Sequence, residues 1–96
     1  MAIQSFADVA TEIFFVTGKA DRKAGWAAIR SVAKRKLDML HYAKQLNDLK
    51  VPPGNKLEEL KRNFGGRHSI RINDQGRIVF RWTNAGPTEV CITDYQ

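Results

Sequence analysis

Hydrophobic and polar residues follow two different periods along this 96-residue chain. From about Lys23 to Tyr42, apolar residues recur at steps of three and four, which predicts an amphipathic helix. Its apolar stripe comprises Trp26, Ile29, Ala33, Leu37 and Leu40. A shorter helix is predicted from Asp8, a good N-cap residue, to Thr17, where Gly18 ends it. Its apolar positions are Val9, Ile13, Phe14 and Val16, and the weak alternation of residues 2–6 is compatible with a short opening strand.

Beyond the sequence Val51-Pro52-Pro53-Gly54-Asn55, which marks a joint within the domain, the period changes to two, the spacing of β-strands. Successive strands are predicted at residues 68–72, 77–82 and 89–95, separated by the turn sequences 73–76 and 84–87. A segment around Lys56–Lys61 is a candidate for one more strand. We therefore expect a single α+β domain over residues 1–96, with two N-terminal helices packed on one face of a small antiparallel sheet.

The composition narrows the possible partners and cofactors. Sixteen Lys and Arg against ten Asp and Glu leave a net charge of +6, which indicates an anionic partner. One cysteine and two histidines make neither an internal disulfide nor a structural zinc site without carboxylates, so neither is expected, and the sequence shows no motif for a cofactor. The N-terminus lacks the basic region of a signal peptide and the apolar runs are short, which predicts a cytoplasmic protein that does not span a membrane.

Basic residues are concentrated on two predicted surfaces. Strand alternation places Arg77 and Arg81, together with Arg71, on the sheet face opposite the apolar side chains. A basic sheet face is typical of proteins that bind a phosphate backbone, although arginines at such positions also serve solubility. The long helix carries a second basic face, Arg30, Lys34, Arg35 and Asp38, best interpreted as a solvated surface with a charge pair to Asp38.

The remaining candidate groups favour structural roles. His68 is in phase with Ile70 and Ile72, which favours a histidine packed at the edge of the core over one that stacks on RNA. His41 is interpreted as a helix C-terminal cation, and Cys91 as a small packing residue. No Ser-His-Asp order, Gly-rich phosphate loop or metal-ligand cluster is present, which excludes the commonest hydrolase and nucleotide-binding sites.

Several segments together resemble the HigB branch of the RelE-like toxins over nearly the whole chain. They are the opening Ile3-Gln4-Ser5-Phe6, Arg35–Leu40, Pro52–Lys61, His68–Gln75, Arg77–Trp82 and the terminal Asp94-Tyr95. The resemblance implies a type II toxin whose ribonuclease activity cuts translated mRNA in the ribosomal A site. It also implies a helix-turn-helix antitoxin of the HigA-like kind as partner, with operator DNA bound only through that antitoxin.

The same resemblance assigns roles to individual residues. In this family the ribose 2′-OH attacks the adjacent phosphate without a metal, so the protein moves protons and stabilises the phosphorane. Arg77 matches the arginine that faces the phosphorane, and Asp94 and Tyr95 match the C-terminal acid and aromatic pair. The remaining catalytic candidates are Lys61, Glu58 and Gln96, and the RNA-binding candidates are Lys56, Arg71, Arg81 and His68.

Two positions depart from the family pattern. Many relatives have histidine where Gln96 stands, and some have histidine where Glu58 stands; glutamine cannot exchange a proton near neutral pH. Loss of an acid–base group typically costs about 10²–10⁴-fold in rate. The alternative is therefore a catalytically weak or inactive protein that binds the ribosome, inhibits translation and acts with its antitoxin as a co-repressor.

Overall fold

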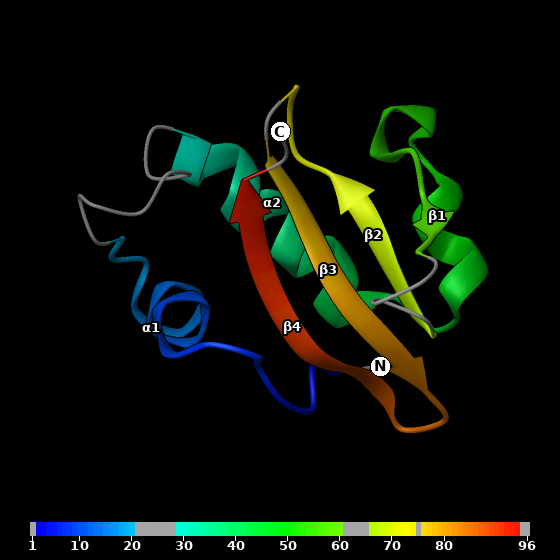
Figure 1. Ribbon diagram of the computed structural model, residues 1–96, viewed down its shortest axis with the longest axis horizontal. Helices are drawn as coiled ribbons and strands as arrows, with labels where there is room; N and C mark the ends of the chain where they lie inside the picture. The colour runs from blue at the N-terminus through cyan, green and yellow to red at the C-terminus, as the bar shows by residue number, and fades with distance from the viewer. Residues whose placement is uncertain (1, 21–28, 61–65, 75, 95–96) are drawn as a thin grey trace.

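The chain forms an antiparallel sheet with helices on one face, as the computed structural model shows (Figure 1). It describes residues 2–20, 29–60, 66–74 and 76–94. The elements are α1 (Val9–Thr17), α2 (Arg30–Tyr42), the 3-10 helices η2 (Leu46–Lys50) and η3 (Pro53–Asn55), and strands β1 (Glu58–Glu59), β2 (Arg67–Arg71), β3 (Gly76–Thr83) and β4 (Gly86–Asp94). The strands follow one another in the order β1-β2-β3-β4. This arrangement confirms the predicted α+β class.

Helix α1 begins and ends where its capping residues predict. The Asp8 carboxylate accepts a hydrogen bond from the Thr11 N–H at 2.6 Å, which satisfies a donor left free at the helix start. Gly18 adopts the left-handed conformation (φ 78°), and its N–H donates to the Phe14 carbonyl. Of the apolar positions in this helix, Phe14 is buried, whereas Val9, Ile13 and Val16 are exposed.

The hydrophobic core lies between α2 and the sheet. Ala33, Leu37 and Leu40 of α2 are fully buried, as the stripe of the predicted helix requires. They belong to one cluster with Ile70, Ile78, Phe80, Val90 and Ile92 of the strands. Trp82 packs against this cluster while partly buried; Trp26 and the predicted start of the long helix lie outside the described residues. The core therefore lies against the apolar face of the sheet, and the opposite face is not covered by α2.

Residues 2–6, whose weak alternation was compatible with a short opening strand, do not form one. It lies beside β4 in extended form, with a single parallel bridge between Phe6 and Val90 and a hydrogen bond from the Gln4 N–H to the Pro87 carbonyl. Strand β4 departs from regular pairing here: the register shifts near Phe80 and Glu89 has a positive φ of 51°. An irregular edge cannot support a continuous ladder.

Candidate functional site

The face of the sheet turned away from α2, which we call the open face, gathers four arginines. Arg67 lies opposite Arg81 in the antiparallel register, and Arg71 lies opposite Arg77. Ile70, Ile78 and Phe80 alternate with them and point into the core. Strand alternation alone was sufficient to predict that Arg71, Arg77 and Arg81 share this face.

Arg77 is the most enclosed of these arginines. Only 14% of its side chain is exposed, and its Nη1 lies 2.6 Å from Oε1 of Glu58. The same nitrogen donates to the hydroxyl of buried Ser69 at 2.9 Å. Glu58 comes from β1, Ser69 from β2 and Arg77 from β3, so three strands fix one guanidinium. Because its position is set before any ligand arrives, this group is suited to a charge that develops in a fixed place.

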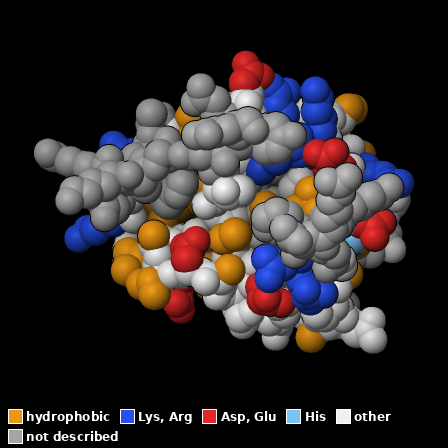
Figure 2. Space-filling view, in the orientation of Figure 1, with side chains coloured by type: hydrophobic (Ala, Val, Ile, Leu, Met, Phe, Trp, Pro, Cys, Tyr) orange, Lys and Arg blue, Asp and Glu red, His pale blue; other side chains and the backbone are white. Residues whose placement is uncertain are grey.

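The arginines of the open face form ion pairs with acidic side chains, and Figure 2 shows red acidic groups next to the blue basic ones. Glu89 accepts from Arg67 at 2.9 Å through one carboxylate oxygen and from Arg81 at 3.0 Å through the other. Arg71 pairs with Asp74 in the following turn and also donates to the Asn73 carbonyl. The sequence pattern did not predict that Glu89 and Asp74 pair with these arginines. Glu89 reaches both arginines from an irregular position in β4, which the period of the strand does not reveal.

Gly66 makes room for this cluster. It has a φ of 83°, and a Cβ atom built there would lie 2.6 Å from Nη1 of Arg81. Glycine adopts this backbone conformation without the strain that a side chain would add. Gly66, just before β2, thus allows the Arg81 side chain to lie across the backbone and reach Glu89.

Other candidates take different places. His68 lies on the core side of β2, where its ring stacks on Phe80 at 6.2 Å between centroids, which confirms the packed position. Lys56 is exposed after η3. Asp94 pairs through its backbone with Gly76, one residue before Arg77, and nothing is described of its side chain. Lys61, Tyr95 and Gln96 lie outside the described residues.

Two further polar groups serve the fold. Burial raises the pKa of the Cys91 thiol, and the nearby Asp8 carboxylate adds to the effect, so the thiol stays protonated and unreactive near neutral pH. Burial, and secondarily the charge of Arg35, lowers the pKa of Lys36, whose ammonium donates to the Asn55 side chain. Lys36 was counted with the basic residues, but it joins α2 to η3.

The charge pair predicted on the helix face is present. Lys34 and Asp38 are 2.7 Å apart, which confirms the solvated-surface interpretation for this pair. Within the described ranges, no group of three or more His, Cys, Asp or Glu side chains is arranged to hold a metal ion. Among the same residues, no helix is long and apolar enough to cross a membrane.

Comparison with known proteins decides the family. A family model described as the RelE-like toxin of the type II toxin–antitoxin system HigB matches residues 4–95. The chain belongs to the HigB-like toxins. Toxin HigB-1 of Vibrio cholerae is 38% identical to it over 84 residues, which cover 88% of this chain and 86% of that toxin. An uncharacterised Haemophilus influenzae protein is 42% identical over 53 residues, 55% of this chain and 52% of that protein.

The fold agrees with this membership. A chain of the YoeB–YefM complex from Staphylococcus aureus superposes with a TM-score of 0.59 and covers 100% of this chain and 99% of that one. At 18% identity the likeness concerns the fold alone. The chain is thus a type II toxin of the RelE-like class, whose members are generally endoribonucleases, and the open face carries the arginine that the family resemblance singles out.

Proposed function

We propose that this HigB-like toxin is a metal-independent endoribonuclease that cleaves translated mRNA in the ribosomal A site. The observation that carries the proposal is the enclosure of Arg77 by Glu58 and Ser69 on the open face. In the proposed reaction the 2′-OH of a ribose attacks the adjacent phosphorus. The 5′-oxygen leaves, which gives a 2′,3′-cyclic phosphate and a 5′-hydroxyl end.

Arg77 stabilises the extra negative charge of the phosphorane in this scheme. A guanidinium offers a planar set of donors with a permanent charge, which suits phosphate oxygens. Glu58, whose side chain is 52% exposed, holds Arg77 in the free protein. An incoming phosphate competes with Glu58 for the guanidinium, and a Glu58 carboxylate released beside the ribose is placed to accept the 2′-OH proton.

The other assigned residues complete the reaction. Lys61 adds positive potential at the phosphate, Asp94 orients or accepts a proton, and Tyr95 stacks on a base or donates a hydrogen bond. Gln96 takes the position of the family's histidine and contributes hydrogen bonds without proton transfer.

RNA binding uses the charge around this centre. Arg71, Arg81 and Lys56 contact flanking phosphates, and the paired acids Asp74 and Glu89 keep the arginines extended until RNA replaces them. His68 serves RNA only from the other side of the sheet, because its ring packs on Phe80. Such binding releases counterions and weakens as salt rises.

The proposed partners follow from membership in a toxin–antitoxin family. A HigA-like antitoxin with a helix-turn-helix domain holds the toxin inactive, and operator DNA is bound through the antitoxin alone. The fold-level likeness to a chain of the YoeB–YefM complex supports a toxin that assembles with a partner. Ribosome and mRNA are the targets of the free toxin.

A reconstituted translation reaction tests the proposal. Purified toxin is added to ribosomes programmed with a defined message, and the same message without ribosomes serves as the control. We expect cuts within the codon in the A site, no cuts in free RNA, and the same rates from toxin that was treated with EDTA and dialysed before it was added to the ribosomes. An intact message on stalled, toxin-bound ribosomes would instead support the second candidate, inhibition without cleavage, which the residues Glu58 and Gln96 at histidine positions favour.

A further inference from the structure

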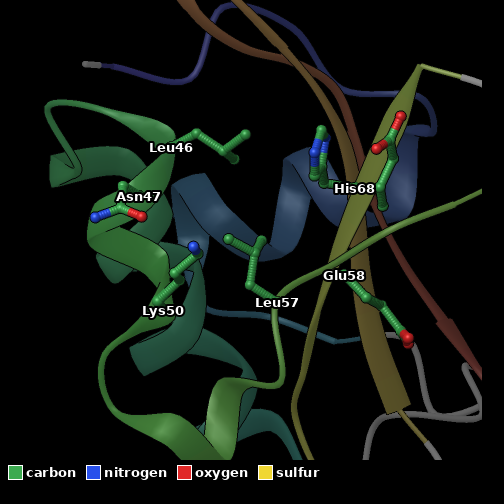
Figure 3. Close-up of a pocket in the computed structure, with 7 residues that line it drawn as sticks. Leu46, Asn47, Lys50, Leu57, Glu58 and His68 are labelled. Atoms are coloured by element: carbon green, nitrogen blue, oxygen red, sulfur yellow. The ribbon is translucent and has the colours of Figure 1, made fainter.

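A cavity of about 390 Å³ lies beside strand β1 (Figure 3). It opens to solvent and is bordered by η2, by the segment leading into β1 and by β2. The lining residues are Leu46, Asn47, Lys50, Leu57, Glu58, Glu59 and His68. Its volume falls in the range of small-ligand sites, about 300–1,000 Å³.

The walls combine apolar surface with an incomplete set of polar contacts. Leu46 from η2 and Leu57 beside β1 are partly buried against the core. The Nδ1 atom of His68 is buried and has no hydrogen-bond partner among the described residues. Buried polar atoms are almost always satisfied, so an orphaned one at a cavity indicates a missing partner. Stacking on Phe80 fixes the ring, and therefore the direction in which this atom seeks a partner.

Glu59 supplies an acid on the same side. It lies directly opposite His68 in the antiparallel register, so the two side chains share one face of the sheet. The Glu59 side chain is exposed and accepts hydrogen bonds only. The wall therefore offers a carboxylate and an imidazole nitrogen on the same face, which suits a ligand whose edge carries N–H groups.

The cavity borders the candidate catalytic centre at Glu58. Glu58 belongs to its lining, yet the Glu58 carboxylate points away from Leu46 and Lys50 and reaches Arg77 at 2.6 Å (Figure 3). Strand β1 is two residues long, with Glu58 on the open face and Glu59 on the cavity face. A chain whose phosphate meets Arg77 needs to pass only this short edge strand to place the next group in the cavity.

We propose that the cavity binds a nucleobase of the RNA, next to the phosphate held by Arg77; this rests on the proposed function. Leu46 and Leu57 contact the faces of the base, and its edge lies toward His68 and Glu59. The exocyclic amine of adenine or cytosine donates to the Glu59 carboxylate. Uracil presents carbonyl oxygens where those bases have the amine, so it meets the carboxylate unfavourably.

Nuclear magnetic resonance titration of the purified toxin with AMP, CMP and UMP tests this without a ribosome. We expect amide shifts at Lys50, Leu57 and Glu59 with AMP and CMP, and much smaller shifts with UMP. The variant Glu59→Gln should weaken AMP binding about tenfold, the size of one charge-assisted hydrogen bond, and reduce the difference from UMP. The variant Glu12→Gln, which neutralises an exposed glutamate of α1, is the matched control.

Equal shifts with all three nucleotides, or shifts confined to the amides of Arg71 and Arg81, would overturn the proposal, because they report binding through phosphate. Cavity shifts with an antitoxin fragment but with no nucleotide would overturn it in favour of a protein ligand. Base-dependent shifts without any cleavage on ribosomes would support the cavity and refute the proposed function. Cleavage on ribosomes without nucleotide shifts at the cavity would support the proposed function and refute base binding in the cavity.

Discussion

Replacing Arg77 with alanine separates a catalytic arginine from one that only adds positive charge. The change removes the guanidinium from Glu58 and from the hydroxyl of buried Ser69. Removal of one fixed donor to a developing charge typically lowers kcat about 10²–10³-fold, and we expect a loss at least this large. The matched control is Arg30→Ala, which removes the same charge from an exposed position of α2.

The structural cost of Arg77→Ala is small enough for the test to be clean. Loss of a hydrogen bond that leaves a buried partner unsatisfied costs about 1–3 kcal/mol, but Glu58 is half-exposed and water solvates it, so about 1–2 kcal/mol is expected. In a domain of this size that lowers Tm by about 4–16 °C. Typical domains have about 5–15 kcal/mol of stability, so the variant should remain folded.

The assay is single-turnover cleavage on programmed ribosomes at saturating toxin, with circular dichroism to verify folding. Arg77→Lys keeps the charge but loses the planar fork, and should fall between the parent and the alanine variant. If folded Arg77→Ala cleaves as fast as Arg30→Ala, Arg77 contributes charge alone and the reasoning fails.

Three further changes test other parts of the account. Gln96→His restores an acid–base group and should raise the cleavage rate about 10²–10⁴-fold on programmed ribosomes; an unchanged rate would show that no imidazole is needed there. The backbone N–H of Lys44, helped by that of Gln45, holds the pKa of Asp48 below its usual value of 3.8, so Asp48 contributes stability above that pH that is lost as the pH falls through the lowered pKa. Asp48→Asn should therefore lower the urea midpoint near pH 7, and a difference from the parent that does not narrow as the pH falls below 3.8 would contradict this. Gly66→Ala should destabilise the fold by about 1–2 kcal/mol because of its positive φ, and should weaken RNA binding by displacing Arg81. Gly54→Ala, where an added Cβ meets nothing within 4 Å, is its control in both denaturant unfolding and RNA binding.

The elements set by local signals were predictable from sequence. Asp8 and Gly18 mark the ends of α1 because capping depends on the residues at the helix ends themselves. The period-two pattern located β2, β3 and β4 and placed Arg71, Arg77 and Arg81 on one face. The segment around Lys56–Lys61 contributes the short edge strand β1.

Contacts between distant segments were not predictable. Glu58 of β1 reaches Arg77 of β3 across the intervening strand β2, a neighbourhood set by the sheet order. Glu89 meets two arginines from an irregular position in β4. The helix η2, which forms one wall of the cavity, has no clear periodicity; Asp48 stabilises its start by accepting from the Lys44 and Gln45 N–H groups. Val9, Ile13 and Val16 show the converse, an apolar pattern that the fold leaves exposed.

Mapping of transcript 5′ ends in cells that express the toxin tests the central claim most directly. The account predicts new ends that lie within codons of translated messages, that carry a 5′-hydroxyl, and that are absent when Arg77→Ala is expressed at the same level. Untranslated RNA should stay intact. Inhibited translation with no new ends, or ends spread equally over untranslated RNA, would contradict ribosome-dependent cleavage by this chain.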